Sequence, residues 1–216
     1  MHIALFGAGG QIARRIAREA LDRGHQVTAI VRDPATFRKY DDRLEVVQGD
    51  ATDAASVARA AKGADAIVNA ISPRPSPSGR PASSLVDGAR AVIAGARQAG
   101  VERLLAVGGA SSLEVAPGVR LYDTPEFPEA YKAEAREGID SLDVYRNESG
   151  DLDWTFISPA AEIGPGERTG KYRTGGDQLL ADKDGKSFIS YEDYAAALVD
   201  ELERGRNLRR RMTVAY

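Results

Sequence analysis

The residues best suited to chemistry begin with a glycine-rich turn near the start of the chain. Gly7, Gly10 and Ala13 follow one another at intervals of three, between an apolar run and a helical pattern. The first glycine permits a tight turn, the second lets a pyrophosphate approach the backbone, and the small third residue keeps helix and strand close. The backbone N–H groups of Gln11 and Ile12, at the positive end of the helix dipole, would then bind phosphate. The pattern predicts a dinucleotide-binding turn.

A second set of residues lies where the second predicted strand ends. An NAD site usually has an acidic residue there, which binds the ribose 2′-hydroxyl. This chain has Arg32 first and Asp33 after it, with Arg38 and Lys39 nearby. A guanidinium suits a 2′-phosphate and also stacks on adenine. We therefore favour NADP(H) as the cofactor. NAD(H) stays possible if Arg32 is only a surface residue and Asp33 binds the ribose.

Hydroxyl groups are the candidate catalytic residues. Ser111 and Ser112 follow the fifth predicted strand and either polarise an acceptor or bond a turn. Tyr131 lies in a segment expected to cover the ligand cleft at the carboxyl ends of the strands, although a surface role is the alternative. His2 and His25 flank early strands on the side away from the cleft. With two histidines and no cysteine, the sequence predicts no transition-metal site.

Short β-branched runs alternate with longer amphipathic stretches, which predicts βαβ units around a parallel sheet. The expected strands are residues 2–6, 26–31, 44–48, 66–71, 103–107, 154–157 and 211–215, the last at an edge of the sheet. The expected helices are residues 11–23, 53–62, 84–99, one ending near 149, and 190–202. On the first helix, Ile16 and Ala20 share the apolar face and Glu19 points away from it. The fold class is α/β, a doubly wound Rossmann-type sheet in a single domain spanning residues 1–216.

Three stretches interrupt this alternation, at about residues 72–82, 113–129 and 158–176. They are rich in proline or glycine and follow strands directly. Ligands of open parallel sheets bind outside the carboxyl ends of the strands, so we expect these cleft loops to act as lids. A further cluster, Arg206, Arg209, Arg210 and Arg211, is expected to form a solvated turn before the last strand.

Composition excludes several classes of protein. The net charge of −3 gives no basic face for nucleic acid. The absence of cysteine excludes disulfides and thiolate chemistry. No apolar run approaches the ~20 residues of a membrane span, and the N-terminal residues lack the pattern of a signal peptide. We expect a cytoplasmic protein whose partner is a small-molecule acceptor.

Longer motifs extend this interpretation over nearly the whole chain. They are Gly7-x-x-Gly10-x-x-Ala13, Val31-Arg32-Asp33-Pro34, Gly49-Asp50-Ala51-Thr52-Asp53, Asp65-Ala66-Ile67-Val68-Asn69, Leu152-Asp153-Trp154-Thr155 before Ser158-Pro159, and Ile189-Ser190 before Asp193-Tyr194-Ala195. The chain resembles the atypical short-chain dehydrogenase/reductases of the NAD(P)H-binding group. That group includes flavin reductases, biliverdin-IXβ reductases and NmrA-like redox sensors. The resemblance implies that Asp50 and Ala51 border the adenine, that Asn69, Ala70 and Ile71 border the ribose, and that Pro159 and Ala160 approach the nicotinamide.

The chain departs from typical short-chain dehydrogenases in its proton-transfer residues. Those enzymes use a serine after the fifth strand and a Tyr-x-x-x-Lys pair. No tyrosine here has a lysine four residues later, and Gly109 takes the place of the serine. We therefore predict an NADPH-dependent reductase of a small planar acceptor, such as a flavin or quinone-like molecule. The main alternative is a non-catalytic redox sensor that binds NAD(P). An epimerase or dehydratase is less favoured, because that chemistry needs a positioned base.

Overall fold

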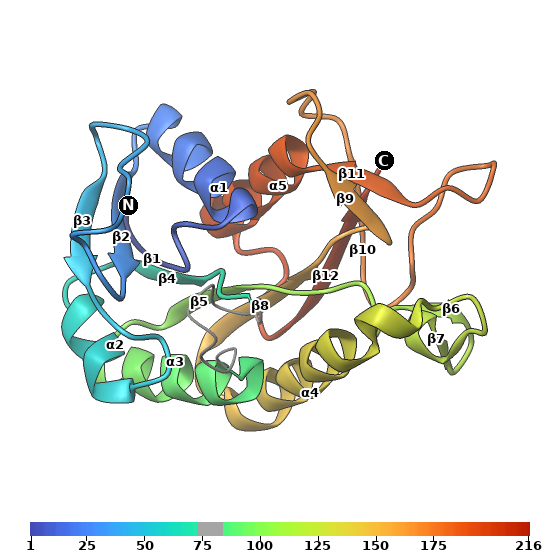
Figure 1. Ribbon diagram of the computed structural model, residues 1–216, viewed down its shortest axis with the longest axis horizontal. Helices are drawn as coiled ribbons and strands as arrows, with labels where there is room; N and C mark the ends of the chain where they lie inside the picture. The colour runs from blue at the N-terminus through green and yellow to red at the C-terminus, as the bar shows by residue number, and fades with distance from the viewer. Residues whose placement is uncertain (73–83) are drawn as a thin grey trace.

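A computed structural model describes residues 1–72 and 84–216, and its centre is an eight-stranded sheet (Figure 1). The strand order is β10-β12-β8-β5-β4-β1-β2-β3. The strands are β1 (His2–Phe6), β2 (Gln26–Val31), β3 (Glu45–Gln48), β4 (Ala66–Asn69), β5 (Arg103–Val107), β8 (Asp153–Ser158), β10 (Arg173–Gly175) and β12 (Arg210–Ala215). All neighbouring pairs are parallel except β10 with β12. The predicted doubly wound Rossmann-type sheet is confirmed.

Helices cover both faces of the sheet, which explains why its central strands are apolar on both sides. In Figure 1, α1 (Gln11–Asp22) and α5 (Tyr191–Arg204) lie above the sheet. Below it lie α2 (Ala54–Ala60), α3 (Leu85–Ala99) and α4 (Lys132–Glu148). One cluster of buried side chains fills the α1–α5 side and a second fills the α2–α4 side. The alternating inward and outward side chains of each strand supply both clusters.

Local sequence signals set the ends of these helices. Asp53 caps α2 and Ser84 caps α3, each by accepting a hydrogen bond from a backbone N–H of the first turn. Ser190 caps α5 in the same way, through the N–H of Asp193. Gly100, in the left-handed conformation with φ of 72°, ends α3. These caps fix where the helices begin or end, and α2 is shorter than the expected 53–62.

The long stretches between strands contain more regular structure than the sequence suggests. Residues 113–129 include a small hairpin of β6 (Glu114–Ala116) and β7 (Val119–Arg120) and the 3₁₀ turn Leu121–Asp123. Within 158–176, β9 (Glu162–Gly164) pairs with β11 (Phe188–Ser190), and β10 pairs with β12. Because β10 lies outside it, β12 is not the edge strand we expected. The predicted loop at 72–82 falls almost entirely outside the described residues.

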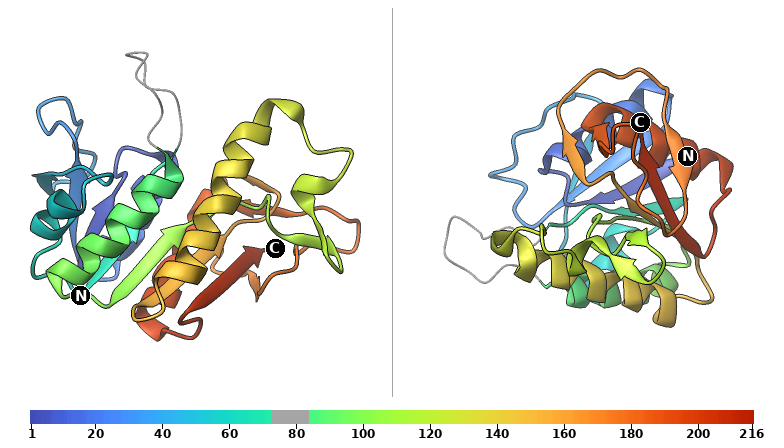
Figure 2. Two further views of the ribbon diagram at one scale, coloured as in Figure 1. Left: turned by 90° about the horizontal axis from the view of Figure 1, so that it is seen from below. Right: turned by 90° about the vertical axis from the view of Figure 1, so that its right-hand side faces the viewer.

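The views in Figure 2 show where the hairpin lies. The segment from β6 to the start of α4 projects beyond that helix, away from β1–β3.

Within residues 1–72 and 84–216, no helix is long and apolar enough to cross a membrane. The cytoplasmic location stays a prediction.

Candidate functional site

The sheet reverses its winding direction at β1, which lies between β4 and β2. Clefts for ligands form at such switch points, outside the carboxyl ends of the strands. Gly7 follows β1 there, with φ of +77°, and a Cβ at this position would lie 2.4 Å from the carbonyl oxygen of Ala70. Only glycine fits a left-handed backbone that approaches another backbone so closely. The turn therefore brings the ends of β1 and β4 into contact.

The start of α1 presents unpaired backbone donors at this place. Gly10 is the N-cap of the helix, donates its N–H to Gly7 and lacks a capping side chain. The N–H groups of the first turn, from Gln11 onward, have no carbonyl within the helix to bind. The side-chain oxygen of Gln11 accepts a hydrogen bond from Arg15, so its NH₂ group is left to donate. Gly10 and Gln11 are exposed, and the turn fits an anionic pyrophosphate.

The adenosine end of such a ligand would meet the strand ends of β2 and β3. Arg32 is exposed immediately after β2, and its carbonyl accepts a hydrogen bond from Gln48. The Asp33 carboxylate accepts the N–H of Ala35 and so stabilises a turn. The Asp50 carboxylate accepts two hydrogen bonds from Thr52, from its N–H at 2.9 Å and its hydroxyl at 2.7 Å. The side chain of Arg32 is exposed at this place, and one carboxylate oxygen each of Asp33 and Asp50 accepts hydrogen bonds from its own turn.

Beside Asp50, Ala51 packs against the buried α2–α4 cluster. The predicted ribose residues follow β4. The side-chain amide of Asn69 donates to the Tyr145 hydroxyl at 3.0 Å, and its oxygen accepts the N–H of Ile71 at 3.3 Å. Both groups of the Asn69 side chain are thus used inside the fold. Burial raises the pKa of Tyr145 to about 12, so this hydroxyl stays protonated. Ala70 and Ile71, which are partly exposed, remain as residues that can face a ribose.

At the other end of the cleft, β8 leads into the buried residues Pro159 and Ala160. The Tyr194 hydroxyl on α5 donates to the carbonyl of Ile157 at 2.6 Å, and the N–H of Gly108 donates to the same oxygen at 2.8 Å. These two bonds fix the end of β8 against β5 and α5. Pro159 and Ala160, which are predicted to approach the nicotinamide, therefore follow a strand end that hydrogen bonds hold in place.

The three candidate catalytic hydroxyls do not converge. Ser111 is only 8% exposed and donates to the Ala135 carbonyl of α4 at 3.2 Å. Ser112 accepts a hydrogen bond from Arg211 at 2.8 Å, so its own proton remains free to donate. Tyr131 is 61% exposed at the end of the short 3₁₀ turn before α4. Of the three, Ser112 is the hydroxyl that is partly exposed and has its proton unused among the described residues.

Arg211 is a site residue that the sequence analysis assigned wrongly. It is 5% exposed rather than part of a solvated turn, and its guanidinium contacts the Asp177 carboxylate as well as Ser112. The N–H of Glu114 also bonds the carbonyl of Asp177 at 2.9 Å. Arg211 therefore ties the segment after β5 to the segment after β10. An arginine inside a strand of otherwise buried residues was the signal for this role.

The glycines after β5 explain the missing serine. A Cβ on Gly108 would lie 2.1 Å from the ring of Phe156, which fills that space. A Cβ on Gly109 would have its nearest neighbour, the Ser111 hydroxyl, 4.0 Å away. The serine of typical short-chain dehydrogenases is thus replaced at Gly109 by an open position. The position four residues after Tyr131 is Ala135, which is buried against the fold.

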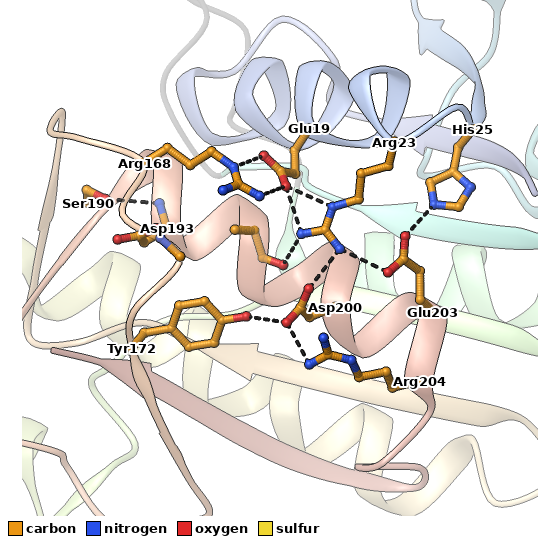
Figure 3. A network of polar contacts seen from close by, with 12 residues as sticks. Glu19, Arg23, His25, Arg168, Tyr172, Ser190, Asp193, Asp200, Glu203 and Arg204 are labelled. Atoms are coloured by element: carbon orange, nitrogen blue, oxygen red, sulfur yellow. Dashed lines mark hydrogen bonds and ion pairs between the residues drawn. The ribbon is translucent and has the colours of Figure 1, made fainter.

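Part of the predicted loop at 158–176 is fastened to α1. Glu19 is only 9% exposed, contrary to its expected position away from the core side. Arg168 donates two hydrogen bonds to its carboxylate, at 2.6 and 2.7 Å, and Arg23 donates a third at 2.8 Å (Figure 3). The bonds from Arg168 hold the pKa of Glu19 below its ordinary value against the opposing effect of burial. A buried carboxylate is stable here because two guanidinium groups neutralise it.

The same loop is fastened to α5. The Tyr172 hydroxyl donates to Asp200 at 2.7 Å, and the backbone N–H of Gly170 donates to Asp193 at 2.7 Å. Asp193 also accepts the Thr169 hydroxyl. Figure 3 shows the Tyr172 hydroxyl of the loop pointing toward Asp200 of α5. Residues 168–172 therefore lie along the α1–α5 layer instead of moving freely over the strand ends.

Comparisons with known proteins agree with this geometry. A family model described as NAD(P)H-binding matches residues 7–204. A crystal structure from Burkholderia pseudomallei, named "Putative exported protein", shares 49% identity and a TM-score of 0.88, with both chains covered completely. A "putative epimerase" from Bacteroides thetaiotaomicron shares 40% identity and a TM-score of 0.87, over 100% of this chain and 96% of the other. A "putative NADH-flavin reductase" from Streptococcus pneumoniae shares 34% identity and a TM-score of 0.84, over 100% and 99%.

Proposed function

Because the chain belongs to the NAD(P)H-binding oxidoreductase family of atypical short-chain dehydrogenase/reductases, we propose that it is an NADPH-dependent reductase of a small planar acceptor, a flavin or quinone-like molecule. When bound, NADPH supplies the hydride. The residues after β1 bind its pyrophosphate, and the rigid end of β8 at Pro159 and Ala160 orients the nicotinamide. The observation that carries the proposal is this dinucleotide turn combined with an open position at Gly109.

The choice of acceptor follows from the candidate proton donors among residues 1–72 and 84–216. Reduction of an isolated ketone places negative charge on one oxygen, so a positioned acid is needed as the hydride arrives. The Ser111 proton is already bonded to the Ala135 carbonyl, and Tyr131 lies on the surface. Ser112 keeps its proton, but it is held by Arg211 and belongs to no Tyr-x-x-x-Lys arrangement. A flavin or quinone spreads the charge over a conjugated ring, and water can protonate it afterward. Proximity and orientation then make the larger contribution to the rate.

The names of similar proteins support this reaction more than its rival. A flavin acceptor agrees with the name of the Streptococcus relative, whereas that name specifies NADH. The epimerase name of the Bacteroides relative implies proton abstraction from a substrate, for which a positioned base is required. In this chain the Tyr-x-x-x-Lys pair that would serve is missing. We therefore propose a reductase rather than an epimerase.

The test is steady-state oxidation of NADPH and NADH, followed by the loss of nicotinamide absorbance, with riboflavin, FMN, FAD and a small quinone in turn. Rapid turnover that depends on the acceptor supports the reductase. Tight NADPH binding without turnover on any acceptor contradicts it and supports a non-catalytic redox sensor.

Arg32 supports a preference for NADPH over NADH. A hydrogen bond to a charged group contributes about 1.5–3 kcal/mol. At about 1.4 kcal/mol per decade, this is roughly 10- to 100-fold in affinity. Arg32→Ala should lose most of the preference and retain NADH binding, as measured by calorimetric titration. Equal affinities of the unmodified protein for NADPH and NADH would show that Arg32 is only a surface residue.

A further inference from the structure

The side chain of Arg14 lies between the glycine-rich turn and the loop that follows β2. Its Nε donates to the carbonyl of Gly9 at 3.3 Å. Its guanidinium carbon lies 5.0 Å from the centroid of the Tyr40 ring, within the range of a cation–π contact. Gly9 belongs to the turn after β1, whereas Tyr40 belongs to the loop that Arg32 begins. The Arg14 guanidinium therefore bridges the two segments.

Tyr40 supports Arg14 with its ring rather than its hydroxyl. The ring packs on the buried α1–α5 cluster and meets Phe37 edge-on, with 5.9 Å between centroids. The hydroxyl oxygen is buried without a hydrogen-bond partner among the described atoms. Burial raises the pKa of Tyr40 to about 12, so the ring stays neutral. Tyr40 is thus a fixed apolar surface beneath the Arg14 guanidinium.

Several cations on α1 and in the loop after β2 form no ion pair with a described residue. Among the described residues, the following five cations have no carboxylate oxygen within 4.0 Å: Arg14, Arg18, Arg32, Arg38 and Lys39. The neighbouring acids are engaged elsewhere, because Asp33 accepts the N–H of Ala35 and Asp41 pairs with Arg43. The positive charge of the five cations is not neutralised by an ion pair among the described residues, which would favour an anion bound near them.

We propose that Arg14 and Arg32 together bind the 2′-phosphate of NADPH, with Tyr40 positioning Arg14. This inference rests on the proposed function, because it requires the dinucleotide to occupy the turn after β1. In such a site the adenosine ribose lies between the glycine-rich turn and the end of β2, where an arginine accommodates the 2′-phosphate. Arg14 borders that place from the turn and Arg32 from the strand. The Nη groups of Arg14 remain available, since its bond to Gly9 uses only Nε.

The experiment compares two probes that differ only in the phosphate, 2′,5′-ADP and 5′-AMP, by calorimetric titration. Arg14→Met keeps an apolar stem on Tyr40 and removes the charge. It should weaken 2′,5′-ADP binding by roughly 10- to 100-fold and leave 5′-AMP binding unchanged. Arg206→Met, which changes an exposed arginine after α5, is the control and should leave the affinity for both probes unchanged.

Variants of Tyr40 test the positioning role. Tyr40→Phe retains the ring and should bind both probes normally. Tyr40→Ala removes the surface beneath Arg14 and should weaken only 2′,5′-ADP. Thermal melting of each variant with and without 5′-AMP shows whether it is folded and binds adenosine.

Two results would overturn the inference in different ways. If the unmodified protein prefers 2′,5′-ADP but Arg14→Met keeps that preference, Arg14 does not bind the 2′-phosphate. The proposed preference for NADPH would then depend on Arg32 alone. If the unmodified protein binds 2′,5′-ADP and 5′-AMP equally, the pair and the NADPH preference are both wrong. Turnover with NADH would still decide the reductase activity separately.

Discussion

Replacing Gly10 by valine should abolish cofactor binding and leave the fold nearly intact. A Cβ on Gly10 would meet only the carbonyl oxygen of Gly7, at 3.4 Å, and the backbone φ of −72° suits any residue. The main cost to stability is a poorer N-cap, about 1 kcal/mol, which lowers the melting temperature by about 2–4 °C. The valine side chain would, however, occupy the path by which a pyrophosphate approaches the first turn of α1.

The expected loss of affinity for NADPH follows from the backbone N–H groups that the valine side chain would keep away from the pyrophosphate. Two backbone N–H groups, those of Gln11 and Ile12, would each give a charge-assisted hydrogen bond of about 1.5–3 kcal/mol. Losing both costs about 3–6 kcal/mol, or at least ~100-fold in the Kd for NADPH. Calorimetric titration measures this Kd, and thermal melting reports the fold.

Two other glycines serve as controls for the same measurements. Gly150→Val adds a side chain where no atom of the described residues lies within 4 Å, so stability and affinity should both be retained. Gly7→Ala should instead destabilise the protein by about 2–5 kcal/mol, from its positive φ and the contact with Ala70. If Gly10→Val binds NADPH as tightly as the unmodified protein does, the turn after β1 is not the cofactor site.

Three further predictions concern the hydroxyls, the buried amide and the buried acid. Ser111→Ala and Ser112→Ala should each slow flavin reduction by well under ~100-fold, and a collapse of kcat with normal NADPH affinity would reveal a general acid. Tyr145→Phe leaves the buried amide of Asn69 without its acceptor and should cost about 1–3 kcal/mol in urea denaturation, whereas an unchanged midpoint would contradict that contact. Because the pKa of Glu19 is lowered in the folded state, its ion pairs stabilise the protein above the unfolded-state pKa and that stability is lost as the pH falls through the folded-state value. Glu19→Gln should therefore have a lower melting temperature at neutral pH, and its melting temperature should change less as the pH falls. If the melting temperatures of the variant and the unmodified protein fall in parallel with pH, Glu19 does not contribute to the pH dependence.

The fold could be predicted from sequence where the determining signals are local. The turn at Gly7 and Gly10, the cap at Ser190 and the glycine that ends α3 each act within a few residues. The right-handed connections of parallel βαβ units then limit the strand orders that are possible. The position of β10 could not be predicted in this way, because three residues pair with a strand that comes much later in the chain.

The residues of the candidate site could likewise be predicted from sequence only where their signals are local. The glycine-rich turn and Arg32 are evident from spacing alone, although their binding roles remain predictions. The inward direction of Asn69 depends on Tyr145, 76 residues away, and the burial of Glu19 depends on Arg168, 149 residues away. Side-chain direction is decided by such distant partners, and the periodicity of a single helix or strand does not contain them.

The pairing of α1 with α5 has a consequence for synthesis of the chain. Arg15 of α1 and its partner Glu192 of α5 are 177 residues apart. At about 5–20 residues per second, a ribosome needs roughly 10–35 s to make the intervening chain. Throughout that time the apolar side of α1, with Ile16, lacks its covering helix. Nascent chains that have not yet reached Tyr191 therefore leave this side of α1 without α5.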